Sequence, residues 1–145
     1  MKLNIKAWLS AFRLRTLPLS LSCIAAGSFL AGAEESFKWP VFLLAITTTL
    51  FLQILSNLAN DYGDSEHGAD SHERVGPERA VQSGAISMRT MKQAMYAFTL
   101  LSLISGVVLL YVSFKNHGLL YPILFFTLGL GSIAAAVKYT AGKNP

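Results

Sequence analysis

Residues 39–64 read "WPVFLLAITTTLFLQILSNLANDYGD", and this stretch decides the fold. No charged side chain occurs between Trp39 and Asn60. The stretch is therefore long enough to cross a hydrocarbon core of roughly 30 Å, which takes about 20 helical residues. Two aspartates, Asp61 and Asp64, follow at once. The stretch thus predicts a membrane-spanning helix whose polar end carries acidic side chains.

Three other stretches have the same apolar character, and the composition of the whole chain agrees with them. Of the 145 residues, 52% are hydrophobic and 14% are charged, and the mean hydropathy is +0.45, far from an ordinary soluble domain. In lipid, backbone N–H and C=O groups must be paired within the segment, which favours helices over strands. We therefore predict an all-α polytopic membrane bundle with four spans, at residues 17–33, 40–58, 95–114 and 119–137.

The orientation of these spans follows from the basic residues, because positively charged segments are retained in the cytoplasm. Lys38 and Lys115 are the two basic residues of the short outer loops. The other ten of the twelve fall on the opposite side, which predicts a cytoplasmic N-terminus and a cytoplasmic connection at residues 59–94. These ten are Lys2, Lys6, Arg13, Arg15, Arg74, Arg79, Arg89, Lys92, Lys138 and Lys143.

The net charge of +4 does not indicate a nucleic-acid partner. The basic residues are spread over segments next to the spans and form no continuous stripe. Anionic lipid headgroups account for them better. Membrane lipid is therefore an expected partner, and nucleic acid is not.

The connection at 59–94 contains six of the eight acidic residues, and long connections of this kind are usually functional. If the second span continues as a helix, then Asn57, Asp61 and Asp64 share one face. Carboxylate and amide oxygens suit Mg²⁺, which normally completes its coordination with water and substrate phosphate. The alternative to a metal site is that these acidic side chains only face solvent at the end of the helix. That arrangement is less favourable, because negative charges at a helix C-terminus oppose the helix dipole.

Two arginines follow this acidic segment, with a Gly-Pro turn between them. Arg74 and Arg79 lie in "HERVGPERAVQSGAIS", and arginine pairs bidentately with phosphate. A simpler interpretation is that these two arginines only retain the loop in the cytoplasm. Acids that hold Mg²⁺ and arginines that hold oxyanions are together what a site needs to bind a diphosphate.

The stretch "NLANDYGDSEHGAD", with "GPERAVQSGAIS" after it, resembles the first aspartate-rich motif of the UbiA-type intramembrane prenyltransferases. Within that family it is most similar to the branch that acts on 1,4-dihydroxy-2-naphthoate in menaquinone biosynthesis. The opening "AFRLRTLPLSLSCIAAG" looks like the family's first helix and "AAAVKYTAGKNP" like the end of its fourth. The resemblance runs along the whole chain.

The resemblance implies a Mg²⁺-dependent enzyme of the bacterial inner membrane whose active site faces the cytoplasm. Its reaction would transfer a polyprenyl group, octaprenyl in many bacteria, from polyprenyl diphosphate to the aromatic acceptor. Carbon dioxide and diphosphate would be lost, and demethylmenaquinone would form. The alternatives are another acceptor such as 4-hydroxybenzoate, a CDP-alcohol phosphotransferase, or a membrane transport or assembly subunit.

The resemblance also assigns roles to individual positions. Catalysis would involve Asp61, Asp64, Arg79 and Tyr139, and Tyr139 aligns with a tyrosine that often lines the family's cavity. Asp70 aligns with the motif's last aspartate, and the five residues "SEHGA" before it exceed the spacer in many members. The diphosphate would bind at Asn57, Asn60, Arg74 and Arg79, and the metal at Asp61, Asp64 and Asp70.

The family has more membrane helices than four and a second aspartate-rich motif, whereas this chain stops at Pro145 with one motif. Small-residue faces such as "GLGLGSIAAA" are typical of close helix contact in membranes. Residues 1–145 are therefore expected to be the N-terminal half of the bundle, with the remaining C-terminal helices as its partner. Alone, this half is expected to be inactive.

Overall fold

The computed structural model describes residues 4–67 and 79–141, and all regular structure within these residues is helical. The connections between the elements are turns and short loops. The elements in chain order are α1 (Ile5–Phe12), a 3-10 turn η1 (Leu14–Thr16), α2 (Leu17–Ala33), α3 (Trp39–His67), α4 (Met88–Phe114) and α5 (Leu120–Ala141).

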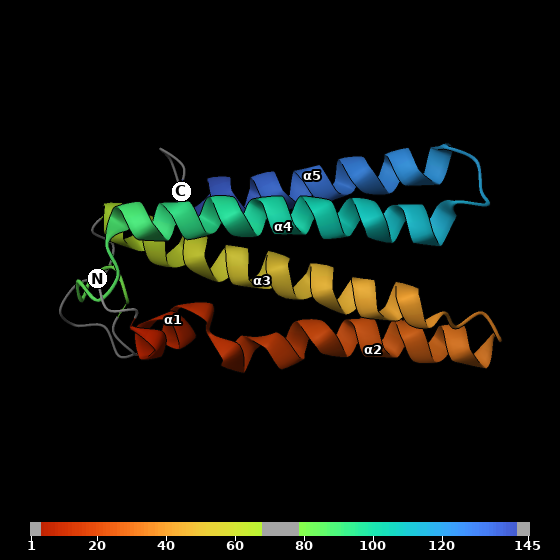
Figure 1. The fold of residues 1–145 in the computed structure, drawn as a ribbon, viewed down its shortest axis with the longest axis horizontal. Coiled ribbons are helices and arrows are strands. Elements are labelled where there is room, and N and C mark those ends of the chain that lie inside the picture. Colours follow the sequence, from red (N-terminus) through yellow and green to blue (C-terminus); the bar gives the residue numbers. More distant parts are fainter. Residues whose placement is uncertain (1–3, 68–78, 142–145) are drawn as a thin grey trace.

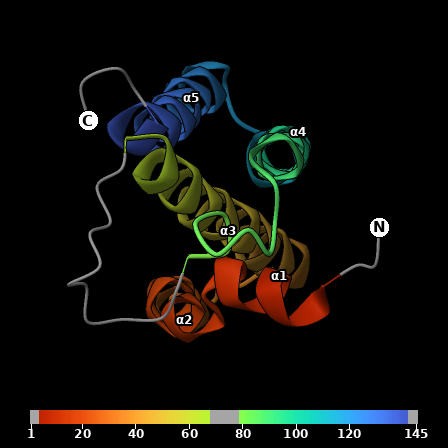
Figure 2. The same ribbon diagram turned by 90° about the vertical axis from the view of Figure 1, so that its left-hand side faces the viewer.

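Helix α3 occupies the centre of the bundle and packs against all four other α-helices. Figure 1 shows α1 and α2 on one side of α3 and α4 with α5 on the other, and Figure 2 shows the same arrangement end-on. The C-terminus of α3, the N-terminus of α4 and helix α1 lie at one end of the bundle, called here the Asp61 end. The arrangement makes α3 the scaffold for whatever this end does.

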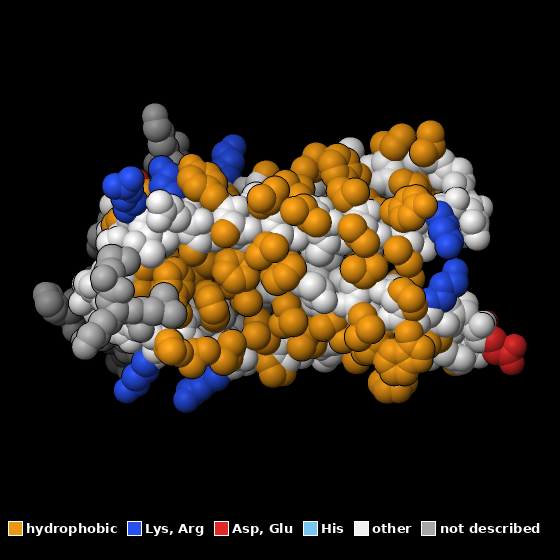
Figure 3. Space-filling model, in the orientation of Figure 1, with side chains coloured by type: hydrophobic (Ala, Val, Ile, Leu, Met, Phe, Trp, Pro, Cys, Tyr) orange, Lys and Arg blue, Asp and Glu red, His pale blue; other side chains and the backbone are white. Residues whose placement is uncertain are grey.

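The predicted four spans are confirmed by length and composition. Within the described residues, four helical segments are long and apolar enough to cross a membrane: Ile5–Ala33, Trp39–Glu66, Met88–Phe114 and Leu120–Lys138. Large apolar side chains such as Leu19, Phe29 and Tyr111 are exposed on them, and Figure 3 shows such side chains covering the length of the bundle. The chain is a multi-pass membrane protein.

The expected bounds of two spans and of the loop between them need correction. Helix α3 does not end at residue 58 but continues to His67, and α4 begins at Met88 rather than at 95. Much of the connection expected at 59–94 is therefore helix. The amphipathic start of α4 has its own N-cap, in which Ser87 Oγ accepts a hydrogen bond from Thr90 N at 3.2 Å.

Helix α1 was not predicted, because its eight residues are far fewer than a membrane span needs, although they are clearly amphipathic. Asn4 caps it, and its Oδ1 accepts a hydrogen bond from Ala7 N at 3.2 Å. The helix ends where Arg13 adopts a left-handed conformation, with φ 49° and ψ 56°. The chain then turns through η1 into α2, which has Pro18 in its first turn.

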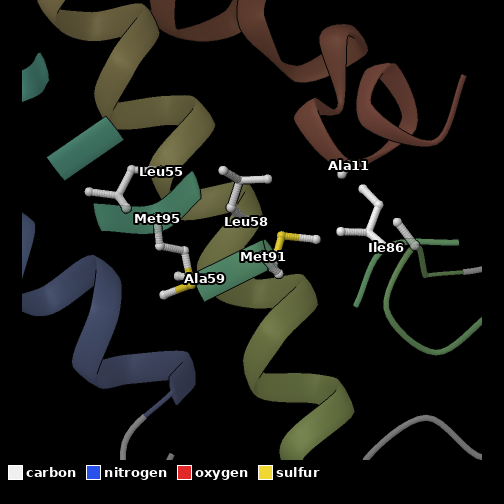
Figure 4. Close-up of a cluster of buried hydrophobic side chains, with 8 residues drawn as sticks. Ala11, Leu55, Leu58, Ala59, Ile86, Met91 and Met95 are labelled. Carbon is white, nitrogen blue, oxygen red and sulfur yellow. The ribbon is translucent and has the colours of Figure 1, made fainter. Parts of the chain in front are cut away.

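The buried core lies at the Asp61 end rather than in the middle of the spans. Leu55, Leu58 and Met91 are fully buried there, where α3 meets α4. The same cluster also contains Ala11 from α1 and Ile86 from the segment before α4 (Figure 4). This packing joins α1, α3, α4 and the segment 79–87 into one unit that positions the polar residues around it.

Candidate active site

The C-terminal extension of α3 brings the predicted acidic residues onto one packed face. Asn57 and Asp61 are only 3% and 2% exposed, and Asp64 follows Asp61 on the next turn of the same helix. This confirms that the second span continues as a helix past Asp61 and Asp64, as far as His67. At Asn57 and Asp61 this face is covered by α1 and by the segment 79–87, whereas Asp64 stays partly exposed.

Asp61 ties the segment 79–87 to α3. Its Oδ2 accepts a hydrogen bond from Ala80 N at 3.1 Å, and its Oδ1 accepts one from Val81 N at 3.4 Å. Hydrogen bonds to a carboxylate are stronger than those between neutral groups, and they offset part of the cost of burying the charge. The carboxylate therefore has a structural task in addition to any role in binding.

Arg79 forms an ion pair with Asp64. The Arg79 side chain is 10% exposed, whereas that of Asp64 is 27% exposed. The expected proximity of Arg79 to the acidic residues is therefore present in the fold. Asp64 is the more accessible of the two aspartates, so it is the one that a ligand at this end of the bundle reaches more easily.

Asn57 holds the corner between α1 and α2. Its Nδ2 donates to the backbone oxygen of Phe12 at 2.9 Å and to Thr16 Oγ1 at 3.2 Å. The sequence suggested diphosphate binding for this residue, and the structure adds a fixing role that the sequence did not reveal. Asn60, the other predicted diphosphate ligand on α3, is half-buried.

Three other predicted site residues are not placed. Asp70 and Arg74 lie outside the residues that the structure describes. The backbone of Tyr139 belongs to the last turns of α5, and its side chain is outside the description. The roles expected for these residues stay predictions.

Arg13 is a charged residue near the site that sequence reasoning treated only as an orientation signal. It is half-buried, unlike the exposed Arg15 two positions later, and it lies at the corner of α1 and α2 that Asn57 holds against α3. The sequence carried no signal for this position, because Arg13 and α3 are distant in the chain and come together only through the packing of α1 on α3.

The donor set is of the kind that suits a divalent metal ion. Asp61 and Asp64 provide carboxylate oxygens one helical turn apart, and each carboxylate oxygen has more than one lone pair. Among the described residues, no group of three or more potential ligands of the His, Cys, Asp or Glu type occurs. Two carboxylates fit Mg²⁺ if water and phosphate oxygens complete the coordination, as this ion usually requires.

Comparison with known proteins places this arrangement in a family. Residues 20–144 match the UbiA prenyltransferase family. A 1,4-dihydroxy-2-naphthoate octaprenyltransferase of Haemophilus influenzae is 40% identical over 98% of this chain and 46% of that protein. Proteins of the same name from Escherichia coli and Mycobacterium tuberculosis are 44% and 34% identical, over 97% and 95% of this chain and 45% and 44% of theirs.

The chain spans about half the length of the curated relatives it matches. No solved structure matches it significantly. The family match nevertheless covers both the spans and the acidic end of α3, where the described site lies. The chain belongs to the UbiA prenyltransferase family.

Proposed function

We propose that this chain is the N-terminal half of a prenyltransferase that transfers an octaprenyl group from its diphosphate to 1,4-dihydroxy-2-naphthoate. Carbon dioxide and diphosphate leave, and demethylmenaquinone forms. The observation that carries the proposal is the cluster of Asp61, Asp64 and Arg79 at the end of a membrane-spanning helix in a chain of this family. The names of its relatives support the choice of acceptor.

The residues suit the ionisation of an allylic diphosphate, since that step needs negative charge stabilised on the leaving group. The Arg79 guanidinium presents several N–H donors in a planar fork, which matches phosphate oxygens. Asp64 holds that fork in place at the surface of the site. Arg74, in the same connection, is proposed to add a second such group.

Members of the family generally use a divalent metal ion. We propose Mg²⁺, held by Asp61, Asp64 and Asp70, with Asn57 and Asn60 close to the bound diphosphate. When bound, the ion supplies positive charge that stabilises the departing diphosphate. Asp61 also fixes the segment that carries Arg79, so the metal ligands and the arginine are positioned by one set of contacts.

The apolar surface of the bundle suits the second step of the proposed reaction, in which the allylic carbocation must meet the acceptor before water does. The spans expose apolar side chains along their length, which suit a long isoprenoid tail and keep water away from that carbocation (Figure 3). Tyr139, at the Asp61 end of α5, is proposed to border the acceptor. The remaining C-terminal helices are proposed to close this half into a complete bundle in the inner membrane, with the site facing the cytoplasm.

The test uses membranes that contain residues 1–145 together with those remaining helices. They are incubated with octaprenyl diphosphate, Mg²⁺ and both 1,4-dihydroxy-2-naphthoate and 4-hydroxybenzoate, and the products are identified by mass spectrometry. We expect a prenylated naphthoquinol that requires Mg²⁺ and disappears when the metal is chelated. Asp64→Asn should abolish it.

The matched control is Glu66→Gln, because Glu66 is an exposed carboxylate at the end of the same helix. It should leave the rate near that of the unmodified protein. Prenylated 4-hydroxybenzoate would keep the reaction class and change the acceptor. No product with either acceptor would contradict the proposal.

A further inference from the structure

We propose that Arg13 is a diphosphate-binding residue of this site and that Asn57 is the positioning residue that holds it there. This inference rests on the proposed function, because it concerns the diphosphate of the same substrate. Arg13 lies at the corner between α1 and α2, and the proposed reaction has so far given it no role.

The backbone of Arg13 is fixed on both sides. Its N–H donates to the Ser10 oxygen at 3.0 Å, and its own oxygen accepts hydrogen bonds from Thr16 N and Thr16 Oγ1, each at 2.9 Å. Its φ of 49° is a left-handed conformation that a residue with a Cβ adopts only when the surroundings enforce it. Such residues are frequent at functional sites.

Asn57 provides the tertiary contact that enforces this corner. Its amide donates to Phe12 and Thr16, the residues on either side of the 13–15 turn, and it is itself almost completely buried. Asn57 lies one helical turn before Asp61 on α3. The corner is therefore held against the same face of α3 that carries the acidic residues.

Packing supports the same placement. The Phe12 ring lies edge-on against Phe98 of α4, with ring centroids 5.6 Å apart, and Ala11 is buried in the core cluster with Ile86. Figure 4 shows Ala11 and Ile86 at the junction of α1 and the segment 79–87. Arg13 thus follows directly on a residue that is locked between two helices, and it has little freedom to move away.

Two arginines are therefore positioned at this face of α3. Arg79 pairs with Asp64, and Arg13 lies at the corner that Asn57 holds one helical turn before Asp61. A diphosphate bound next to these carboxylates brings its negative charge within the reach of both guanidinium groups. Arg15 serves as a comparison, because it lies in the same turn but is exposed.

The experiment compares Arg13→Gln with Arg15→Gln in the complete bundle. It measures the KM for octaprenyl diphosphate, the KM for the acceptor, and the inhibition constant of inorganic diphosphate. Hydrogen bonds to charged groups are stronger than those between neutral groups. Arg13→Gln should therefore raise the KM for octaprenyl diphosphate and the inhibition constant of inorganic diphosphate by about 10- to 100-fold. The KM for the acceptor and all values for Arg15→Gln should stay within a factor of about 2.

Two further variants separate binding from folding. Arg13→Lys keeps the charge without the planar fork and should recover part of the lost affinity for inorganic diphosphate. Asn57→Ala should also weaken diphosphate binding. Combining it with Arg13→Gln should weaken binding little further, because both changes remove the contact between Arg13 and the diphosphate. An additive double variant would argue against the positioning role.

Thermal unfolding in detergent, with and without inorganic diphosphate and Mg²⁺, gives a readout that does not depend on turnover. Diphosphate should raise the unfolding temperature of the unmodified protein and of Arg15→Gln, but much less that of Arg13→Gln. If the unmodified protein binds diphosphate but forms no product, the proposed reaction fails and the role of Arg13 is still tested. If Arg13→Gln behaves like Arg15→Gln in an active enzyme, the inference about Arg13 is wrong.

Discussion

Asp61 has a structural role in addition to the metal-binding role proposed for it. It is buried, and its two oxygens accept the N–H groups of Ala80 and Val81. Asp64, one turn later, has an arginine partner and remains partly accessible. Two neighbouring aspartates of one motif therefore lie in different environments, and substituting each one should affect the stability of the fold differently.

Asp61→Asn should destabilise the fold more than Asp64→Asn does. An amide offers one acceptor oxygen and places an NH₂ group against a backbone N–H, so the expected loss is about 1–3 kcal/mol for the buried position. Both variants should lose activity. Thermal unfolding in detergent measures the difference, and equal unfolding temperatures for the two variants would mean that Asp61 does not anchor the segment 79–87.

At this scale the sequence allowed the acidic cluster to be predicted, because residue spacing along one helix is a local property, and it allowed Arg79 to be predicted from its place in the polar connection that follows. It did not allow the partners of Asn57 or the position of Arg13 to be predicted. Both depend on how α1 folds back onto α3, and that contact joins residues more than forty positions apart, such as Asn57 and Phe12. Composition and periodicity do not encode such pairs directly.

At the scale of the helices, α3 and α4 contact one another closely through small side chains. Ser102 and Ser105 of α4 are buried, and their hydroxyls donate back to the Phe98 and Ser102 oxygens of the same helix. A Cβ added at Gly106 would lie 3.8 Å from Thr48 Cγ2, which is an ordinary van der Waals distance. An added methyl group therefore meets no clash, and Gly106 also lines a pocket of about 180 Å³ together with Thr48 and Ser102.

Gly106→Ala should stabilise the bundle. The alanine adds an ordinary van der Waals contact with Thr48 and favours the helix by about 0.5–1 kcal/mol relative to glycine. Unfolding in detergent should show a higher transition temperature for this variant than for the unmodified protein. A lower transition temperature would mean that α3 and α4 approach each other more closely at this position than the structure shows.

Helix α1 has one packed side and one exposed side. Ala11 faces the core, whereas Ile5 and Leu9, one turn apart, are 63% and 48% exposed. An amphipathic helix at the end of a membrane bundle typically lies in the interfacial region with its apolar side toward the lipid. The four spans were predictable from apolar length alone, whereas this helix was missed because it is much shorter than a span, although its sequence is amphipathic.

The interfacial position of α1 can be measured with Trp8, since the chain has two tryptophans and Trp39 lies at the opposite end of the bundle. In a Trp39→Phe variant reconstituted in vesicles, lipids brominated near the headgroup should quench Trp8 more strongly than lipids brominated near the chain ends. Quenching by aqueous iodide alone would contradict an interfacial helix. Trp8→Phe, which retains Trp39, is the matched control.

At the scale of the whole molecule, the two ends of the bundle differ in charge. Lys38 and Lys115 are the basic residues between the spans at the end opposite to Asp61, where Glu34 and Glu35 also lie. The remaining basic residues of the sequence fall on the other side of the predicted spans. This asymmetry predicts that the Asp61 end faces the cytoplasm, where the proposed reaction would take up its acceptor and release diphosphate.

Cysteine labelling tests this orientation, because Cys23 is the single natural cysteine. In a Cys23→Ser background, Lys38→Cys and Ala85→Cys place one thiol at an exposed position at each end. A maleimide that does not cross membranes should label Lys38→Cys in intact cells and should label Ala85→Cys only after the membrane is opened. The reverse pattern would place the diphosphate site on the outer face, and the proposed cytoplasmic active site would then be wrong. Equal labelling of both variants in opened membranes is the control that each thiol is accessible.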